Sequence, residues 1–422
     1  ASPGIYINET DQSFLPEGVI QAGAAIVGAT AKGPSDVPQL VSSYAEYVAK
    51  FGELHESGSS TYSFFTTLAA FNYFNNGGET LLVSRATNGD YTPATATVSG
   101  SSAVAFKLNT FSEGADQNSF STAGASGILP SGSKNNIRYE ITNANSASGT
   151  FNLVIRRGDD DDTNKVILEQ YTGLTLDPFD NSYIGKAVGT QYLTVEGSEA
   201  NSYVQVNGEY PSVSKYVYVT EINDTPNYLD SAGNVRNTDD QVKIPTTQTG
   251  SFGGANGEPL AGAKFGKDIT SANIQGVAAG DYTSSFYLLN DTQYKYTSIA
   301  APGLNYTDHS DQLDILLTNT KDRADSIAII DLQDYEGLGI SSAVNQAKNI
   351  NNSYAASYFP WLLASDEALG RLSWAPPSTF ICGVYAYNDR VGEPWFAPAG
   401  LNRGALPTVV RSQRSLTKAN RD

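Results

Sequence analysis

The chain has 422 residues, which at about 150 residues per domain predicts roughly three domains. Charged residues make up 17% of the chain and hydrophobic residues 40%. This hydrophobic fraction is enough to build sizeable cores and excludes a disordered protein. The formal net charge of -18, without a strong basic cluster, argues against a nucleic-acid partner.

Cysteine and histidine content excludes further classes. One cysteine, Cys382, cannot form an intrachain disulfide, and two histidines, His55 and His309, with one thiol cannot build a Cys/His zinc site. The longest apolar run, from Phe380 to Tyr387, is far shorter than the roughly 20 residues that cross a bilayer. The N-terminus also lacks the regions of a secretory signal. We therefore expect a soluble acidic protein, made inside a cell, with no cofactor and no membrane insertion.

Residues 1–22 are predicted to form an extended N-terminal arm. Ile5 and Ile7 alternate with polar neighbours, while Pro3 and Pro16 are incompatible with a helix here. A segment of this composition has no core of its own. We expect it to pair with the sheet of another molecule.

Residues 23–90 are typical of a strand, two helices and a second strand. The apolar run 24–29 is a buried strand, and Ser43 with Glu46 forms a capping box at the start of a helix that Gly52 ends. Apolar residues of this helix follow the i, i+3, i+4, i+7 spacing: Tyr44, Tyr47, Val48 and Phe51. A second helix carries Phe64, Phe65, Leu68 and Phe71 and ends at 76–78. A strand at 81–83 follows.

Residues 91–284 have the texture of an all-β region. Short alternating stretches such as 204–206 and 216–219 are separated by Gly, Ser, Asn and Asp clusters. A region of this length predicts two modules dividing near residue 190, closed by the Gly-rich stretch 250–266.

Residues 285–400 return to alternating strands and helices. Strands are predicted at 296–301, 325–331 and 353–361, and helices around 313–317 and 343–350. This order predicts a mixed or parallel sheet flanked by helices. The predicted fold class is therefore an α/β core domain made of 23–90 plus 285–400, interrupted by the β-rich insertion 91–284, and multidomain α+β in total.

Motifs that suggest catalysis have simpler interpretations. Asp308, His309 and Ser310 are immediate neighbours whose side chains diverge, so Ser310 is predicted to be a helix N-cap rather than a nucleophile. Cys382 is predicted to be a buried structural thiol. The stretch 262–268 lacks the spacing and the Ser or Thr of a phosphate loop. No catalytic, cofactor-binding or metal-binding residue is predicted, and we expect the protein not to be an enzyme.

The acidic run 159–162 also lacks the alternating ligands of a calcium loop, and an exposed hairpin turn is the preferred interpretation. The high Tyr content suits strands and contacts between subunits. For the β-rich region, stacking of aromatic rings on sugars stays open as an alternative.

Several segments, in this order, resemble the tail sheath protein of contractile-tailed bacteriophages. They are 2–9, 25–34, 71–78, 82–85, 357–361, 376–386 and 395–400, with the sequences SPGIYINE, AIVGATAKGP, FNYFNNGG, LVSR, SYFPW, PPSTFICGVYA and WFAPAG. The resemblance covers roughly 1–90 and 285–405. It implies a structural subunit of the virion tail sheath, made in the host cytoplasm.

The resemblance also implies the partners and the assembly residues. Subunits would form a helical homo-oligomer of stacked hexameric rings around the tail tube protein, bounded by baseplate and tail terminator proteins. Contraction would drive the tube through the host envelope for genome delivery. The self-assembly arm would comprise Ser2, Pro3, Gly4, Ile5, Tyr6, Ile7, Asn8 and Glu9.

Residues 401–422 resemble the linker to a further C-terminal domain of the family. Its basic residues are Arg411, Arg414, Lys418 and Arg421. We expect the natural product to continue into that domain. An intact mass of virion-derived protein that matched 422 residues would contradict this expectation.

Two other assignments remain open from the sequence. One is the sheath of a related contractile injection system, which shares this core. The other is a β-rich receptor-binding or decorating protein of the virion surface, which the insertion alone would favour. A glycan-cleaving enzyme would need paired carboxylates in a cleft, and no motif indicates them.

Overall fold

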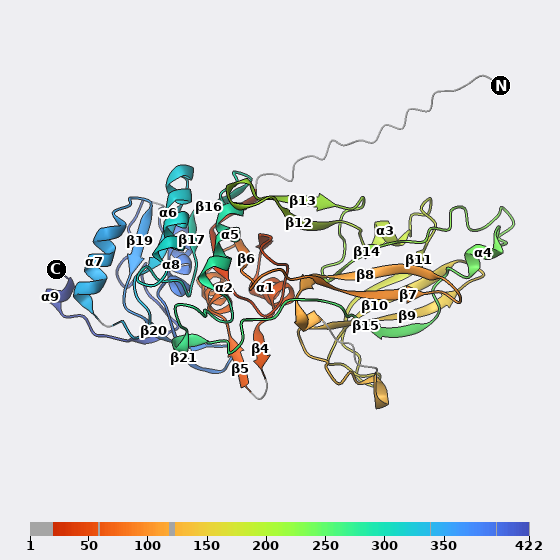
Figure 1. Cartoon of the computed structure of the whole chain (residues 1–422), viewed down its shortest axis with the longest axis horizontal. Coiled ribbons are helices and arrows are strands. Elements are labelled where there is room, and N and C mark those ends of the chain that lie inside the picture. The colour runs from red at the N-terminus through yellow and green to blue at the C-terminus, as the bar shows by residue number, and fades with distance from the viewer. Residues whose placement is uncertain (1–19, 58–59, 118–122, 338, 394, 422) are drawn as a thin grey trace, which may run out of the picture.

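The computed structural model describes residues 20–57, 60–117, 123–337, 339–393 and 395–421. Within them the chain is mixed α/β with several sheets, and it forms two parts arranged along the long axis of the molecule (Figure 1). We call these the α/β part and the β-rich part. The predicted arm residues Ser2 to Glu9 lie outside the described residues.

A six-stranded sheet is the framework of the α/β part. Its order is β19 (Ala355–Tyr358), β18 (Ile327–Asp331), β17 (Ser298–Ala300), β2 (Ala24–Gly28), β6 (Leu81–Arg85) and β3 (Gln39–Val41). Neighbouring strands are parallel except β3, which runs antiparallel to β6. One half of this mixed sheet therefore comes from the C-terminal part of the chain (β19, β18, β17) and the other half from the N-terminal part (β2, β6, β3).

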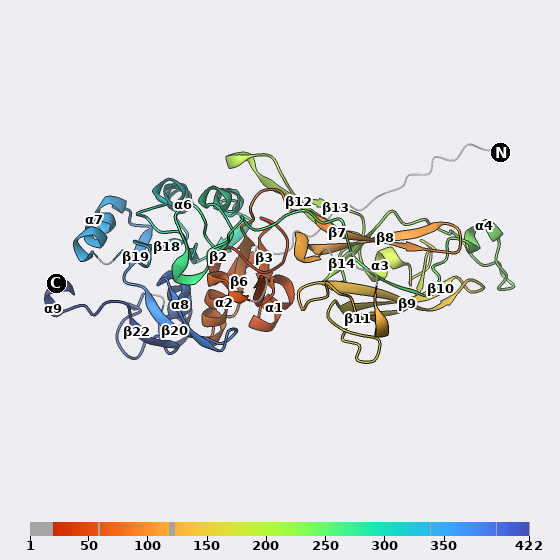
Figure 2. The same ribbon diagram turned by 60° about the horizontal axis from the view of Figure 1, so that its bottom comes forward.

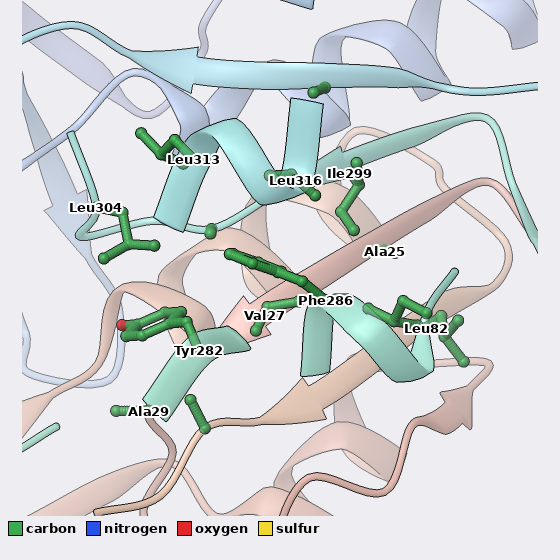
Figure 3. Packing of buried hydrophobic residues seen from close by; sticks show 14 of the residues in the cluster. Ala25, Val27, Ala29, Leu82, Tyr282, Phe286, Ile299, Leu304, Leu313 and Leu316 are labelled. Atoms are coloured by element: carbon green, nitrogen blue, oxygen red, sulfur yellow. The ribbon is translucent and has the colours of Figure 1, made fainter. Parts of the chain in front are cut away.

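Helices cover both faces of this sheet because successive side chains of a strand point to opposite sides. Ala24 and Ile26 pack in a cluster with residues of α1 (Tyr44–Phe51), α2 (Phe65–Asn75) and α8 (Ser378–Val391). Ala25 and Val27 face α5 (Tyr282–Leu288) and α6 (Ser310–Arg323), as Figure 3 shows. Because β2 is buried on both faces, its residues form a continuous apolar run in the sequence.

The predicted helices of this part are confirmed. The Ser43 hydroxyl accepts a hydrogen bond from the backbone N–H of Glu46 at 3.1 Å, and Gly52 ends α1 with a φ of 72°. Helices α6 and α7 (Ile340–Ile350) also contain the predicted helical residues 313–317 and 343–350, and α8 begins within the segment 376–386 that resembles the tail sheath family.

The β-rich part is built from two facing sheets. One contains β14 (Val217–Thr220), β8 (Val104–Glu113) and β7 (Pro93–Ser99). The other contains β11 (Ile167–Thr175), β10 (Thr150–Arg157), β9 (Ile137–Asn145) and β15 (Gln248–Ser251). Alternate residues of both sheets share one buried cluster, with Phe106 and Phe151 rings 5.8 Å apart. This cluster includes residues from both sides of position 190, near which the division into two modules is predicted.

Smaller elements complete the two parts. They are the hairpin β12 (Tyr192–Glu196) and β13 (Tyr203–Asn207), the sheet of β20 (Leu362–Asp366), β21 (Arg371–Ala375) and β22 (Val409–Ser412), the parallel pair β1 (Ile20–Ala22) and β16 (Tyr294–Tyr296), and the hairpin β4 (Leu54–Ser57) and β5 (Ser60–Ser63). Short helices are α3 (Ile184–Ala187), α4 (Thr238–Gln241) and α9 (Lys418–Arg421). Figure 2 shows the helices around the six-stranded sheet from a second direction.

Two features differ from the sequence-based expectations. The strand expected at 296–301 is divided into β16 and β17, because β16 pairs with β1 and β17 pairs with β2, on either side of Gly23. The hydroxyl of Thr297, between β16 and β17, donates to the carbonyl of Gly23. Helix α5 was not predicted. Its first residue, together with Ile274 and Val277, packs in the cluster beneath the six-stranded sheet, so the end of the β-rich stretch belongs to the core of the α/β part.

Candidate assembly surfaces

His309 and its neighbours do not form a catalytic group. The His309 Nδ1 accepts from the backbone N–H of Asn305 at 3.1 Å, and Nε2 lies 2.9 Å from the carbonyl oxygen of Ser271. Both ring nitrogens therefore have backbone partners, and neither is bonded to Ser310. The prediction of Ser310 as N-cap is wrong: His309 occupies that position, since its carbonyl accepts the first helical hydrogen bond from Leu313, and Ser310 is the first residue of α6.

Cys382 lies on α8 and is buried against the six-stranded sheet, as predicted. Burial raises the pKa of its thiol to about 12. A thiol is nucleophilic only as the thiolate, so this residue is a packing element at neutral pH.

The acidic run 159–162 is only partly an exposed turn. Asp159 is exposed, but Asp160 is buried and accepts two hydrogen bonds from Arg156, from Nε at 2.8 Å and from Nη2 at 3.0 Å. The interpretation of the whole run as solvated is therefore wrong for Asp160. Among the described residues, no group of three or more His, Cys, Asp or Glu side chains is arranged to hold a metal ion.

The stretch 262–268 has no phosphate-loop geometry. It ends in a single 3-10 turn, Gly266–Asp268, rather than at the start of an α-helix. The Lys267 ammonium lies 5.6 Å from the centre of the Tyr335 ring, where it makes a cation–π contact.

A buried polar contact joins the two parts of the molecule. The Arg85 Nη1, at the end of β6, donates to the carbonyls of Gly33 at 2.6 Å and Glu113 at 2.9 Å, and the backbone N–H of Ser35 donates to the Glu113 carboxylate at 2.9 Å. Burial raises the pKa of Glu113 to about 7, and that of the neighbouring Asp36 to about 7. Since Glu113 ends a long strand of the β-rich part, these contacts fix that strand to the α/β part.

The segment predicted as a linker, 401–422, is partly built into a sheet. Strand β22 pairs antiparallel with β20, which places Arg411 opposite Leu363. The Arg411 guanidinium lies 5.4 Å from the centre of the Trp374 ring, and Arg414 follows β22. Lys418 and Arg421 lie in α9. The role of these four residues as a linker stays a prediction.

Three large apolar side chains near the end of the described residues are strongly exposed: Trp395 is 77%, Leu401 94% and Val410 62% exposed. The Arg403 guanidinium lies 4.8 Å from the centre of the Phe396 ring. The sequence does not predict these exposures, because no local pattern indicates them.

No helix within the described residues is both long and apolar enough to cross a membrane.

No known family model matches the chain. It is 36% identical over 80 residues to the tail sheath protein of Vibrio phage KVP40, a match that spans 19% of this chain and 12% of the phage protein. Its fold resembles the crystal structure of a sheath tail protein from Listeria innocua with a TM-score of 0.50 at 10% identity, covering 95% of this chain and 63% of that one. A sheath tail protein from Desulfitobacterium hafniense gives a TM-score of 0.41 at 12% identity, over 91% of this chain and 62% of that one. The chain thus covers less than two thirds of each relative.

Proposed function

We propose, from the confirmed resemblance to tail sheath proteins, that this chain is a structural subunit of a contractile tail sheath. The observation that carries the proposal is the agreement between a sequence match to a tail sheath protein and a fold match to a sheath tail protein that covers 95% of the chain. In this function the subunits assemble helically around a tail tube, and their contraction drives the tube through the host envelope.

The construction of the molecule supports this mechanical role. Each part has its own buried cluster, and the Arg85–Glu113 contact fixes one part to the other. A sheath subunit transmits force through contacts that do not close into a dimer, because a repeated non-closing rotation generates a helix. Rigid bodies of this kind can exchange small interfaces for larger ones while their cores stay intact.

Residues 2–9 supply the tether in this proposal. An extended arm that adds a strand to a neighbouring subunit makes its main-chain hydrogen bonds outside the packed body. About four such bonds, at roughly 0.5–1.5 kcal/mol each, would contribute a few kcal/mol per subunit. Within a lattice, the high effective concentration of linked neighbours would keep the subunits together during contraction.

Electron microscopy of the full-length natural protein with its tube protein tests this function. We expect tubes or striated sheaths, and a matched variant that lacks residues 2–9 should form fewer or none. Soluble trimers or monomers under all conditions would overturn the proposal and favour a receptor-binding or decorating protein. A DNA-filled head on the native particle distinguishes a phage tail from a related contractile injection system.

A further inference from the structure

Three ionisable side chains meet where the α/β part joins the β-rich part. Arg85 ends β6 of the α/β part, and Glu113 ends β8 of the β-rich part. Asp36 lies beside Arg85, because its backbone N–H donates to the Arg85 carbonyl at 2.9 Å. The backbone N–H of Glu113 in turn donates to the carbonyl of Gly33 at 3.1 Å. We call Arg85, Asp36 and Glu113 the junction cluster.

The positive charge of the junction cluster is buried and is bonded to backbone groups. The Arg85 side chain is only 6% exposed, and its Nη1 donates to the carbonyls of Gly33 and Glu113 rather than to a carboxylate. Its guanidinium also lies 5.0 Å from the centre of the Tyr91 ring. One guanidinium near two carboxyl groups can balance the charge of only one of them.

The two carboxyl groups of the cluster are stabilised mainly as neutral groups. The Glu113 carboxyl accepts from the backbone N–H of Ser35 at 2.9 Å, and the Asp36 carboxyl accepts from the Ser285 hydroxyl at 3.3 Å. Burial raises the pKa of each carboxyl to about 7 in spite of these donors and of Arg85. For Asp36, the negative charge of Glu113 adds to the increase. Ionisation of the second carboxyl is therefore the unfavourable step.

Other charged groups around the cluster do not remove this imbalance. The positive charges besides His55 are those of Arg85 and Lys32, and burial lowers the pKa of Lys32 to about 8. A rise in pH above neutrality therefore makes the junction more negative through its acids and through this base. The titratable groups that face the two carboxyls or their immediate neighbours are Arg85, Lys32, Asp281, Asp116, His55, Tyr91 and Tyr218.

An open cleft of about 1060 Å³ lies beside the junction and leaves room for movement. Residues 52–56 of the α/β part line one side of it, residues 130–137 of the β-rich part line the other, and Asp116 lies in its wall. The Asn135 side-chain amide donates to the carbonyl of Leu54 at 2.9 Å across this cleft. Each part has its own buried cluster, so a rotation at the junction changes the width of the cleft without repacking either core.

We propose that Asp36 and Glu113 form a pH-sensitive switch that controls how firmly the two parts are joined. While one of the two is protonated, Arg85 balances the charge of the other, and the parts keep the arrangement of Figure 1. When both are ionised, an unbalanced negative charge is buried between the parts, and the β-rich part is released to rotate over the cleft. The inference concerns a single molecule and does not depend on the sheath function.

The direction of the switch follows from the raised pKa values. Both carboxyls have a pKa of about 7 in the closed junction, above their ordinary values of about 4. Their contribution to the closed junction is therefore complete below about pH 4 and is lost as the pH rises through about 7. We expect a closed junction at about pH 5.5 and a loosened one at about pH 8.5.

A distance measurement across the cleft tests the movement. Spin labels are attached to Ala45→Cys, at an exposed site on α1, and Lys134→Cys, at an exposed site on the cleft wall, while the natural thiol, Cys382, is buried. We expect a single narrow distance distribution at about pH 5.5 and a shifted or broadened one at about pH 8.5, with unchanged circular dichroism. The same distribution at both pH values, or a change only when circular dichroism is lost, would overturn the switch.

Matched variants assign the change to the junction cluster. Glu113→Gln keeps an acceptor for Ser35 but cannot ionise, so the distance should stay as at low pH. Asp36→Asn should act in the same way, since Asn tolerates the φ of 57° at this position. His55→Asn, which removes a titratable group 3.9 Å from the Asp116 carboxylate, should retain the pH dependence. A pH dependence that survives in both carboxyl variants, or is lost in His55→Asn, would contradict the assignment.

Amide hydrogen exchange gives a second measurement at the junction itself. The N–H groups of Ser35 and Glu113 are bonded across it, to the Glu113 carboxyl and the Gly33 carbonyl. After correction for intrinsic exchange, we expect their exchange to accelerate about tenfold or more between about pH 5.5 and 8.5 in the wild type, and not in Glu113→Gln. Equal protection at both pH values in the wild type would overturn the inference. Sheath formation by the full-length protein without any pH effect would retain the proposed function and reject only the switch.

Discussion

One buried carboxyl group, that of Asp331, links the stability of this molecule to a raised pKa. Asp331, at the end of β18, accepts hydrogen bonds from the Ser378 N–H at 2.9 Å and the Ser378 hydroxyl at 2.6 Å, at the start of α8. Burial nevertheless raises the pKa of Asp331 to about 7, because these two donors compensate only part of the cost of desolvating the charge.

Asp331→Asn tests the effect of this burial. The native pKa of Asp331 is above its unfolded value of about 4, so its contribution to stability is complete below about pH 4 and is lost as the pH rises through about 7. We therefore expect the melting temperature of the wild type, relative to Asp331→Asn, to fall between about pH 4 and pH 8. Asp90→Asn, at an exposed site, is the control. A difference that is constant with pH would contradict the prediction.

The ion pair of Arg156 and Asp160 is a second residue-level feature. Both side chains are buried, and the Arg156 guanidinium also pairs with Glu140 at 3.0 Å, so the loss of Asp160 removes two charged hydrogen bonds without leaving Arg156 unpaired. We expect Asp160→Asn to lower the free energy of unfolding by about 1.5–3 kcal/mol in urea denaturation. Asp159→Asn, which affects an exposed neighbour in the same run, should cost less than about 1 kcal/mol. Equal effects of the two substitutions would mean that the carboxylate of Asp160 is not what holds Arg156.

At the scale of elements, the approach of α8 to α2 depends on one glycine. A Cβ atom at Gly383 would lie 2.8 Å from the carbonyl oxygen of Asn72, which is closer than such atoms approach. The two helices can therefore pack backbone to backbone only where α8 has no side chain. The sequence indicates the two helices, but it does not indicate that they touch at Gly383.

Gly383→Ala is expected to destabilise the protein by about 1–3 kcal/mol through overpacking. A loss of stability would point to the tight packing against α2, because in an isolated helix the same substitution stabilises by about 1 kcal/mol. Gly280→Ala, where a Cβ meets no atom within 4 Å, is the control in the same thermal melts. An increase in melting temperature for Gly383→Ala would show that α8 can move away from α2 without cost.

At the scale of the whole molecule, the chain enters and leaves the β-rich part at one place. The N–H of Thr92 donates to the carbonyl of Asn256 at 3.0 Å, and the N–H of Asn256 donates to the Thr92 hydroxyl at 2.8 Å. We propose that residues 93–255 are the inserted unit. Ile274 and Val277 remain outside it, since they pack in the core of the α/β part.

Replacing residues 93–255 with a short Gly-Ser linker tests this division. The ends to be joined lie side by side, so the linker adds little closure entropy. We expect the shortened chain to retain helical circular dichroism and a cooperative melt. Removing 93–284 instead should abolish the melt, because it deletes the first three residues of α5, Tyr282 among them, together with Ile274 and Val277, all of which the core of the α/β part needs. A cooperative melt for both deletions would contradict the proposed boundary.

The sequence by itself determined the local elements of this protein. The N-cap at Ser43, the apolar run of β2 and the stripe of α6 are properties of neighbouring residues, and the structure has them where the pattern predicts. The return bond of the predicted capping box goes to the N–H of Ser42 instead of Ser43. The resemblance to tail sheath proteins was also readable from ordered short segments, and the comparisons confirm it. These features needed no knowledge of distant contacts.

Only the tertiary structure decided which polar groups are buried and which apolar groups are exposed. Asp331 is buried beside Ser378, 47 positions further along the chain, and Leu193 and Val206 are exposed on a hairpin whose Tyr192 stacks on Tyr218. The free energy of a side chain depends on what covers it, and these partners are remote in sequence. Local periodicity therefore specified the strands, while long-range packing decided which of their faces meets water.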